Sequence, residues 1–540
     1  TWNLPRLAAR QTRREAALMG FLARRQGMGA AALLLAASTV LSRFMGLLRD
    51  KVISWQFGAG GEADMYFAAF VVPDIINHLL AGGFLSIPAI PLLARRFAED
   101  EEDAWRLFSA MFRWMLLGSV ALTLGAMLLA EPLAAVVAPG FDAARRARLA
   151  FFMRLVLPAQ VFFLCGAVVT ALLYLRRQFS VPALSPLIYN GCIILGGLLT
   201  PLVWPGAGMA GYCVGVSLGA ALGAFCLPLL AASRGGIFWR AVWRHPLIRR
   251  FLLMTLPLML GQTVVYLDEQ FYRVFGSMAG DGAVSLLNYA KRITQVPIGL
   301  MGQAAAVASY PFLVSLLANN DEAGFASTLN TALKTSLALI LPCAAWMLVA
   351  ALPIISAIFQ GGRFGPEESR AAAPLLRLML AFTPFWIVHM VLARGYYAHG
   401  DTLTPAITGT ALTLCCLPLY VWWAVPRGPW AIALVSGGGV AVYVLWLTII
   451  WIRRYGTAAF AGLPPLLLRV LLCTLPAAAL AAFCQSLAAP FTRGLPSFAA
   501  ACATAAAGGL AFAALFLPLA RVFVPSLMAG LPRRPRPKAR

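Results

Sequence analysis

The sequence predicts an all-α polytopic membrane protein, and three observations support this fold class. The chain has 540 residues, of which 61% are hydrophobic and only 12% charged, a composition outside the range of soluble globular domains. Apolar stretches of about 20 residues, each long enough to cross about 30 Å of hydrocarbon, recur along the whole chain. Lys and Arg gather in alternate segments between these stretches. We therefore expect about 14 transmembrane helices, arranged as two six-helix bundles related by a pseudo-two-fold axis along the membrane normal, plus two C-terminal helices.

The predicted spans follow the apolar stretches in chain order. They are roughly 28–48, 63–93, 112–138, 151–175, 182–203, 208–232, 251–278, 283–313, 328–359, 371–398, 404–425, 430–452, 466–489 and 497–520. The second and eighth are long and contain Pro and Gly, so we expect their helices to be broken.

A weak internal repeat divides the chain into two halves. The matching residues, at offsets between 218 and 223, are Phe57-Gly58 with Phe275-Gly276, Pro91 with Pro311, Tyr174 and Pro182 with Tyr397 and Pro405, and the turn Pro139-Gly140-Phe141 with the segment 361–364. Six spans in each half make the repeat parallel, as in many alternating-access carriers.

The repeat and the spans together predict the domain organisation. The expected parts are a basic cytoplasmic N-terminal arm (1–27), an N-terminal bundle of spans 1–6 (28–232), a basic cytoplasmic linker (233–250), a C-terminal bundle of spans 7–12 (251–452), spans 13–14 (453–520) and a basic cytoplasmic tail (521–540).

The net charge of +23 could suggest a nucleic-acid partner, but the positions of the charges argue against one. With an even number of spans both termini lie on one side, and that side carries 25 Lys and Arg against 9 on the other. The positive-inside rule therefore places both termini in the cytoplasm. We expect the basic arm and tail to contact anionic lipid headgroups. The acidic run 99–103 falls in a cytoplasmic loop, where we expect only a solvated face.

The sequence motifs of enzymes are missing. The chain contains no GxxxxGK[ST] phosphate loop, no HExxH, no GxSxG elbow and no EF-hand loop. The four histidines are far apart and none of the ten cysteines shows CxxC spacing, so neither a metal site nor a disulfide framework is expected. We predict that the protein is not an enzyme and uses no cofactor.

Charged residues inside the apolar stretches are the main functional signal. Arg43 and Arg49 lie in the first predicted span and Arg292 in the eighth. An arginine at such depth is costly unless it faces water, a counter-charge or an anionic ligand. Ser42 precedes Arg49 by seven residues and so shares its helix face. Arg49 could instead be an interfacial residue whose side chain reaches the headgroups.

Arginine carries a planar fork that holds phosphate oxygens in pairs. Cations from both halves therefore predict a polar cavity for an anionic ligand such as a diphosphate. An exporter of cationic drugs would need the opposite sign in its cavity. We interpret Arg154 and Arg377, each near the start of its span, as interfacial residues.

Several motifs form a recognisable set. They are Ser42-Arg43-x-x-Gly46-x-x-Arg49-Asp50, Phe57-Gly58-Ala59-Gly60 with Asp64, Ala69-Phe70-x-x-Pro73, Ala138-Pro139-Gly140-Phe141, Tyr289-Ala290-x-Arg292, Val296-Pro297-x-Gly299 and Tyr396-Tyr397-Ala398-x-x-Asp401-Thr402-x-Thr404-Pro405. This set resembles the MviN/MurJ lipid II flippases, a family within the multidrug/oligosaccharidyl-lipid/polysaccharide exporter superfamily. The resemblance covers about residues 30–455, and the first and last motifs are the most specific.

The resemblance implies a multi-pass protein of the bacterial cytoplasmic membrane with fourteen spans and a cationic cavity that opens alternately to either side. It implies transport of lipid II, the undecaprenyl-diphosphate-linked peptidoglycan precursor, to the outer leaflet, with a groove for the polyprenyl tail at spans 13–14. Carried over by position, Arg43, Arg49 and Arg292 resemble the cavity arginines and Asp64 the matching acid. The implied protein partner is the cell-wall synthesis machinery.

The chain departs from the family near the second span. Asn77-His78 stands where the family has an Arg pair, and Gly82 stands where it has Glu. His78 would then replace one cavity cation with a weaker, pH-dependent donor beside Asn77.

A second departure concerns the driving force. Some family members bind sodium at positions that read Tyr272, Cys416 and Tyr420 here. Asp268, one turn before Tyr272, is the candidate substitute for ion coupling. The alternative driving force is the membrane potential, which is worth about 2.3 kcal/mol per charge and 100 mV.

Two other functions remain open from the sequence. A flippase for another polyprenyl-linked oligosaccharide would explain the altered second span. A membrane glycosyltransferase or polymerase would need acidic catalytic residues in an exterior loop, where the candidates Asp142 and Glu367-Glu368 are isolated.

Overall fold

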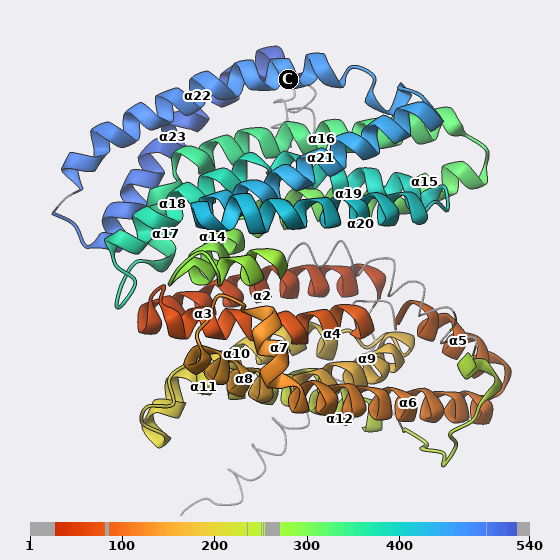
Figure 1. Cartoon of the computed structure of the whole chain (residues 1–540). Helices are drawn as coiled ribbons and strands as arrows, with labels where there is room; N and C mark the ends of the chain where they lie inside the picture. Colours follow the sequence, from red (N-terminus) through yellow and green to blue (C-terminus); the bar gives the residue numbers. More distant parts are fainter. Residues whose placement is uncertain are drawn as a thin grey trace, which may run out of the picture. The chain divides into compact units, whose positions relative to one another are not determined.

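The computed structural model describes residues 27–81, 86–234, 236–249, 251, 253, 270–492 and 494–525, which form helices joined by short loops (Figure 1). This described part of the chain contains no strand beyond an isolated bridge between Gly361 and Phe364. Ten of its helical stretches are long and apolar enough to cross a membrane. The predicted fold class, an all-α polytopic membrane protein, is therefore confirmed.

The ten stretches coincide with predicted spans 3–6 and 9–14. They are Glu101–Leu128, Ala143–Leu175, Ser180–Val203, Ala210–Arg234, Glu322–Val349, Pro366–Ala398, Leu403–Arg427, Pro429–Tyr455, Ala458–Phe491 and Ser497–Phe523. Predicted spans 1, 2 and 8 are also helical, whereas most of predicted span 7 lies outside the described residues. The total of fourteen therefore stays a prediction.

The chain divides into two compact units. Unit 1 comprises Thr1–Ile53 and Gly61–Gln270, and unit 2 comprises Ser54–Gly60 and Phe271–Arg540. Helix α2 (Met28–Phe57) begins in unit 1, and its last turn belongs to unit 2. The predicted domain boundaries, which separate spans 13–14 from the second bundle, stay a prediction.

The further helices of unit 1 are α3 (Gly61–Ala68), α4 (Val71–Ala81), α5 (Ser86–Glu99), α6 (Glu101–Leu128), α7 (Ala130–Val137), α8 (Ala143–Val156), α9 (Ala159–Leu175), α10 (Ser180–Val203), α11 (Ala210–Gly219), the π-helical segment η1 (Ala220–Cys226) and α12 (Leu227–Arg234). Its core lies where α6 packs against α5 and α9, and it includes Trp105, Phe108 and Leu172. Ile248 and Phe251, from the segment after α12, belong to the same buried cluster. The segment that follows α12 is therefore packed against the unit.

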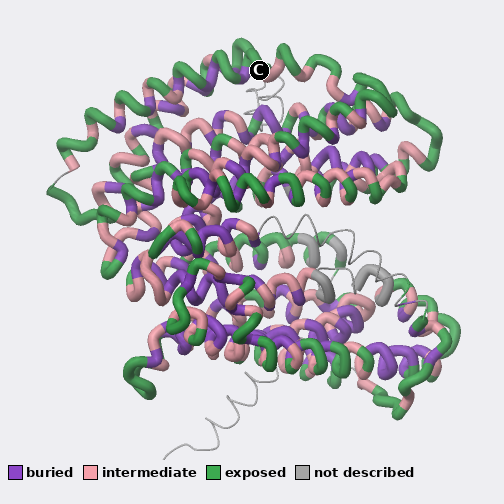
Figure 2. Tube along the Cα trace, in the orientation of Figure 1, coloured by how far each residue is buried: buried purple, intermediate pink, exposed green. Residues whose placement is uncertain are grey.

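The helices of unit 2 are α14 (Ala283–Pro297), the π-helical segment η2 (Ile298–Gln303), α15 (Ala304–Ala318), α16 (Glu322–Val349), α17 (Ala351–Phe359), α18 (Pro366–Ala381), α19 (Thr383–Ala398), α20 (Leu403–Pro418), the π-helical segment η3 (Leu419–Ala424), the short 3-10 turns η4 (Val425–Arg427) and η5 (Ala458–Phe460), α21 (Pro429–Tyr455), α22 (Leu463–Phe491) and α23 (Ser497–Phe523). A buried aromatic group of Phe325, Tyr396 and Trp451 joins α16, α19 and α21. Figure 2 shows this interior as buried, with exposed residues along the outer faces of α22 and α23.

Helices α22 and α23 form a hairpin whose arms lie side by side (Figure 1). The hairpin packs against α16 and α17 of the same unit. Its contact surface includes Ala477, Ala481 and Ala520, which are completely buried. Small residues allow close approach of helix backbones at this surface, and Phe512, Phe516 and Trp346 pack in the same cluster.

The element boundaries repeat between the two halves. Helices α6 and α16 both have 28 residues and begin at Glu101 and Glu322, 221 positions apart. Each is preceded by an aspartate N-cap, Asp100 or Asp321, whose carboxylate accepts backbone N–H bonds from the first turn. The sequence repeat therefore corresponds to two equivalent helices, and each begins with an aspartate N-cap. Aspartate is a common residue at this position.

The two spans that were expected to be broken are interrupted at their turn and proline positions. Predicted span 2 divides into α3 and α4, with the break at 69–70, before α5 continues it. In predicted span 8, α14 ends at Pro297 and passes into the π-helical segment η2. Pro lacks the N–H that would continue the α-helical bonding pattern, so the wider π turn follows it.

Candidate functional site

Helix α2 presents one polar stripe to α10 within unit 1. Ser38 Oγ donates a hydrogen bond to the carbonyl of Ala183. Eleven residues on, Arg49 Nη1 donates to Asn190 Oδ1 at 3.3 Å. Ser42 falls between them at helical spacing and is half-buried. The predicted shared face of Ser42 and Arg49 therefore faces α10.

Arg49 is tied into this unit by its neighbour in sequence. Its Nε and Nη2 both lie 2.9 Å from Asp50 Oδ1, and the Arg49 and Asp50 side chains are only 15% and 1% exposed. Arg43 is half-buried on the same helix. Arg49 thus has a buried carboxylate as counter-charge, which is one of the conditions under which an arginine is tolerated at membrane depth.

The remaining unit 1 candidates lie on α3 and α4. Asp64, on α3, is completely buried. Asn77 and His78 are adjacent and half-buried on α4, which packs against α9. The structure therefore places Asp64 in packed interior and leaves parts of Asn77 and His78 accessible.

Helix α14 carries a polar stripe on one side. Asn288, Lys291, Arg292 and Gln295 recur at the spacing of one helix face, and none of the four is buried. The opposite side is completely or almost completely buried and includes Leu287, Tyr289, Ala290 and Ile293. Helix α14, which forms the first part of predicted span 8, thus keeps the neighbouring cations Lys291 and Arg292 partly accessible.

Tyr272 contacts the first two residues of this stripe, Asn288 and Lys291. Lys291 Nζ lies 4.5 Å from the centre of the Tyr272 ring, an arrangement that favours a cation. The Tyr272 hydroxyl donates to Asn288 Oδ1 at 3.2 Å and accepts from Arg273 Nε at 3.0 Å. The sequence already places Lys291 beside Arg292 in the eighth predicted span, and the structure adds Tyr272 as the partner of Lys291.

The positions that the resemblance connects with sodium do not fit a cation. Tyr420 is completely buried and its ring stacks on Phe275, with centroids 4.6 Å apart. Tyr272 stands beside Arg273 and Lys291, whose charges repel a cation. Among the described residues no group of three or more His, Cys, Asp or Glu could hold a metal ion. Asp268, the predicted substitute, lies outside the described residues.

Two further membrane arginines have the same local role in both halves. Arg154 Nε donates to the carbonyl of Met127 at 3.3 Å, and Arg377 Nε donates to the carbonyl of Leu348 at 3.2 Å. These carbonyls are the penultimate ones of α6 and α16. An arginine at this place donates to a carbonyl near the helix C-terminus, where the partial negative charge of the helix end favours a cation.

The motif around Asp401 joins three helices. Arg454 Nη1, in the last turn of α21, donates to Asp401 Oδ2 at 2.7 Å, and Asp401 Oδ1 accepts the backbone N–H of Thr404 at 2.9 Å. Burial alone would raise the pKa of Asp401, but the bonds from Thr404 and Arg454 hold this pKa below its usual value. Tyr396 adds a hydrogen bond of 2.7 Å to the carbonyl of Leu447. The motif from Tyr396 to Pro405 therefore connects α19, α20 and α21 through hydrogen bonds and has a structural role.

The motif that begins at Phe57 is also structural. Gly58 has φ +65, and a Cβ there would lie 2.6 Å from the carbonyl oxygen of Arg363. Its own carbonyl accepts the Tyr289 hydroxyl at 3.0 Å. Only glycine combines this backbone conformation with so close an approach, so the motif fixes the end of α2 within unit 2.

The predicted site residues are thus distributed between the two units. Unit 1 holds Ser42, Arg43, Arg49, Asp64, Asn77 and His78, and unit 2 holds Arg292. The structure adds Asn190 as a partner of Arg49, and it adds Asn288 on the helix face of Lys291 and Arg292. The contact between Arg49 and Asn190 could not be predicted from the sequence around either residue, because the two lie 141 positions apart.

Comparisons with known proteins agree with the motifs. Residues 53–499 match the family model described as lipid II flippase MurJ. A probable lipid II flippase MurJ from Rhizobium meliloti (strain 1021) is 28% identical over 463 residues, which cover 82% of this chain and 84% of the relative. A probable lipid II flippase MurJ from Vibrio cholerae serotype O1 is 28% identical over 392 residues, covering 70% of this chain and 74% of the relative.

A solved structure shows the same fold. The structure described as lipid II flippase MurJ in an inward closed conformation has a TM-score of 0.74 and 22% sequence identity. The match covers 92% of this chain and 100% of that chain. At this identity the likeness establishes the fold, while the family rests on the sequence match.

Proposed function

Since the chain belongs to the lipid II flippase MurJ family, we propose that it moves lipid II from the inner to the outer leaflet of the bacterial cytoplasmic membrane. Such a protein is a transporter and not an enzyme. The ten apolar helices agree with a multi-pass membrane protein. Lipid II joins a diphosphate to a polyprenyl tail, so the carrier must offer the diphosphate a polar path and leave the tail in lipid.

The cationic stripe on α14 is the observation that carries this proposal. Lys291 and Arg292 remain partly accessible on a helix whose other side is packed. The Arg292 guanidinium would hold two oxygens of the diphosphate, and Lys291 would add a point charge beside it. A cationic drug would be repelled by the same pair, which favours an anionic substrate.

Unit 1 carries the other residues that we propose for substrate binding. Arg43 is the proposed second diphosphate ligand, with Ser42 as a neutral donor one residue away. Arg49 would orient this part of α2, because it is bound to Asp50 and Asn190. Asp64 would support the same region from the interior of the unit, and Asn77 and His78 would form the polar wall of α4.

Transport would proceed by alternating access, with the two units exposing the cations first to one side of the membrane and then to the other. The membrane potential is the proposed driving force, because the residues at the sodium positions do not fit a cation. The hairpin of α22 and α23 would lie along the polyprenyl tail, since its outer face exposes Leu472, Leu475 and Phe483.

Complementation tests the proposal directly. A bacterial host depleted of its own lipid II flippase would express the parent chain, Arg43→Ala or Arg292→Ala. We expect rescue by the parent only, because loss of a charge-assisted contact of about 1.5–3 kcal/mol would slow transport about ten- to hundred-fold. Arg370→Ala is the matched control, since this side chain is 70% exposed and its ion pair is with the 89% exposed Glu367.

The outcomes separate the function from the site. Rescue by all variants would retain lipid II transport and overturn the assignment of Arg43 and Arg292. Failure of the parent despite membrane expression would instead favour another polyprenyl-linked oligosaccharide. In that case Asn77→Arg and Gly82→Glu, which restore the residues of the family, are the first changes to examine.

A further inference from the structure

The segment 236–249, which we call the linker surface, is fixed to unit 1 at its beginning. Arg176, at the end of α9, donates to the carbonyls of Ala232 and Gly236 at 2.7 and 2.5 Å. The backbone N–H of Arg240 donates to the buried hydroxyl of Ser109 at 2.9 Å. These bonds give an irregular segment a defined position on the ends of α6 and α9.

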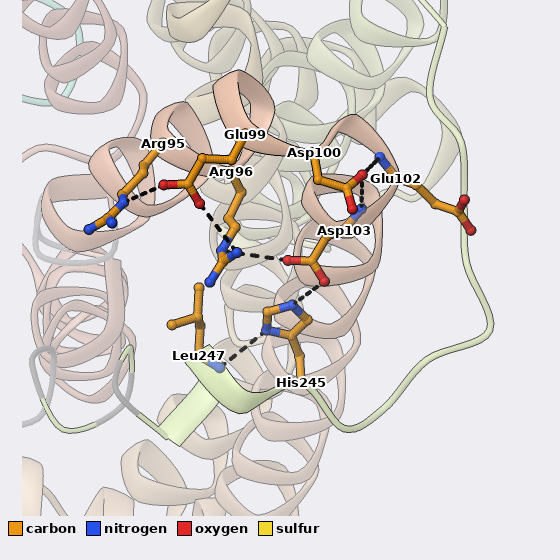
Figure 3. A network of polar contacts seen from close by, with 8 residues as sticks. All are labelled: Arg95, Arg96, Glu99, Asp100, Glu102, Asp103, His245 and Leu247. Atoms are coloured by element: carbon orange, nitrogen blue, oxygen red, sulfur yellow. Dashed lines mark hydrogen bonds and ion pairs between the residues drawn. The ribbon is translucent and has the colours of Figure 1, made fainter.

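Acidic residues at the start of α6 hold the other end (Figure 3). His245 Nε2 lies 3.1 Å from Asp103 Oδ1, and His245 Nδ1 accepts the backbone N–H of Leu247 at 3.2 Å. This pair of contacts assigns the neutral tautomer with the proton on Nε2. Arg96 approaches the second oxygen of Asp103 at 3.5 Å.

The acidic run 99–103 is therefore more than the solvated face that was expected. Asp100 caps α6, and Glu102 lies 3.8 Å from the guanidinium of Arg240. Together with the contact between Asp103 and His245, these interactions engage the acids inside unit 1. The sequence could not reveal them, because the acids and the linker are more than 130 positions apart.

Large aromatic side chains cover the linker surface. The Trp239 ring packs on Phe112, with centroids 4.8 Å apart, and Phe238 packs on Trp105 at 5.7 Å. Phe238 and Trp239 nevertheless remain 55% and 45% exposed. Such residues are costly in water and are typical of the interface between membrane and water.

A tryptophan pair extends this aromatic row onto α6. Trp114 Nε1 donates to the carbonyl of Trp243 at 2.9 Å, and both rings stay more than 40% exposed. Leu116 and Leu117 follow on α6 with exposed side chains. The aromatic row is thus continuous along the chain with apolar residues of a predicted membrane span.

Cations accompany the aromatic row. Arg113 lies over the Trp243 ring at 5.6 Å. Arg244 and Arg249 are exposed, and no carboxylate of the described residues lies within ion-pair distance of either. Their charges are therefore available to an anionic partner.

We propose that the linker surface binds the anionic phospholipid headgroups of the adjoining leaflet. Phe238, Trp239 and Trp243 would lie at headgroup depth, while Arg244 and Arg249 bind lipid phosphates. A lipid is the fitting partner because the aromatic row continues into the apolar surface of α6. A soluble protein would have to enter the headgroup layer to reach it. This inference is independent of the transported substrate.

Lipid photocrosslinking tests the proposal on the full chain in nanodiscs. One set of discs contains phosphatidylglycerol, and the other phosphatidylcholine, each with the same photoreactive group near the headgroup. Mass spectrometry then measures the label on peptides from 236–249. We expect the parent to carry several-fold more label from the anionic probe than from the neutral one. In Arg244→Gln/Arg249→Gln the label from the anionic probe should fall about five-fold for each arginine removed. High salt should reduce the preference in the parent.

The matched control is Arg370→Gln/Arg427→Gln, which removes two exposed arginines elsewhere and should keep the parental preference. Thermal unfolding of Arg244→Gln/Arg249→Gln should match the parent, since Arg244 and Arg249 have no structural partner among the described residues. Equal labelling by the two probes in the parent would overturn the proposal, because the linker surface would then have no preference for anionic headgroups. An unchanged preference in Arg244→Gln/Arg249→Gln would overturn it as well.

Discussion

Arginine has different roles at different positions in this membrane protein. Arg154 and Arg377 bind the penultimate carbonyls of α6 and α16. Arg49 neutralises a buried carboxylate, whereas Arg292 lies on an accessible polar stripe. The presence of an arginine in a span therefore does not by itself indicate a substrate site.

The pair of Arg49 and Asp50 gives a prediction at this scale. Arg49→Met would leave the fully buried Asp50 without its main counter-charge, which typically costs about 3–5 kcal/mol. We expect a lower thermal unfolding midpoint in detergent, measured by circular dichroism. Arg49→Met/Asp50→Asn should recover most of the loss, because the uncompensated charge is then removed as well.

Arg43→Ala is the contrasting variant. It should abolish complementation, since its proposed role is with the substrate. If Arg49→Met were as stable as the parent, the structural role of the ion pair would be wrong.

At the scale of elements, the two halves use the same devices at corresponding positions. The N-caps of α6 and α16, and the arginines that bind their C-terminal carbonyls, recur about 221 to 223 positions apart. Tyr174 and Tyr397 are the penultimate residues of α9 and α19. The repeat in the sequence thus preserves these helix ends.

The caps allow a matched prediction. Asp100→Ala and Asp321→Ala should each lower the free energy of unfolding by about 1 kcal/mol, because first-turn N–H groups lose their acceptor. Asp100→Ser and Asp321→Ser should retain most of the stability. Thermal unfolding in one detergent would provide the comparison, with the 89% exposed Glu367→Ala as a control. A loss in only one half would contradict an equivalent role of the caps.

At the scale of the whole molecule, the fold and the family are established, and the orientation in the membrane is a prediction. The excess of Lys and Arg on one side predicts that both termini are cytoplasmic. The linker surface lies on that same predicted side, where anionic lipids would attract its arginines.

Reporter fusions test the orientation and the span that lies mostly outside the described residues. A fluorescent protein fused after Gly236 should be active, because it folds in the cytoplasm. Alkaline phosphatase fused after Gly280 should be active outside, since one span (251–278) separates the two positions. Fusions after Gly140 and Gly456 provide an exterior and a cytoplasmic control. If the reporters after Gly236 and Gly280 were found on the same side of the membrane, predicted span 7 and the total of fourteen spans would be excluded.

Much of this protein follows from its sequence alone. Apolar length and basic loops predict the fold class and most span positions, because the bilayer imposes both requirements locally. Pro297 predicts a break in span 8, and the motifs around Arg43 and Asp401 identify the family. These signals are local, so they are visible without knowledge of the packing.

Only the tertiary structure decides which charged residues are already engaged. Arg49 is bound to Asn190, 141 positions away, and Asp103 contacts His245 after 142 positions. Lys291 obtains its place over Tyr272 from the packing of two helices. A side chain's partners in space determine whether its charge serves the fold or remains available to a ligand, and chain order does not specify those partners.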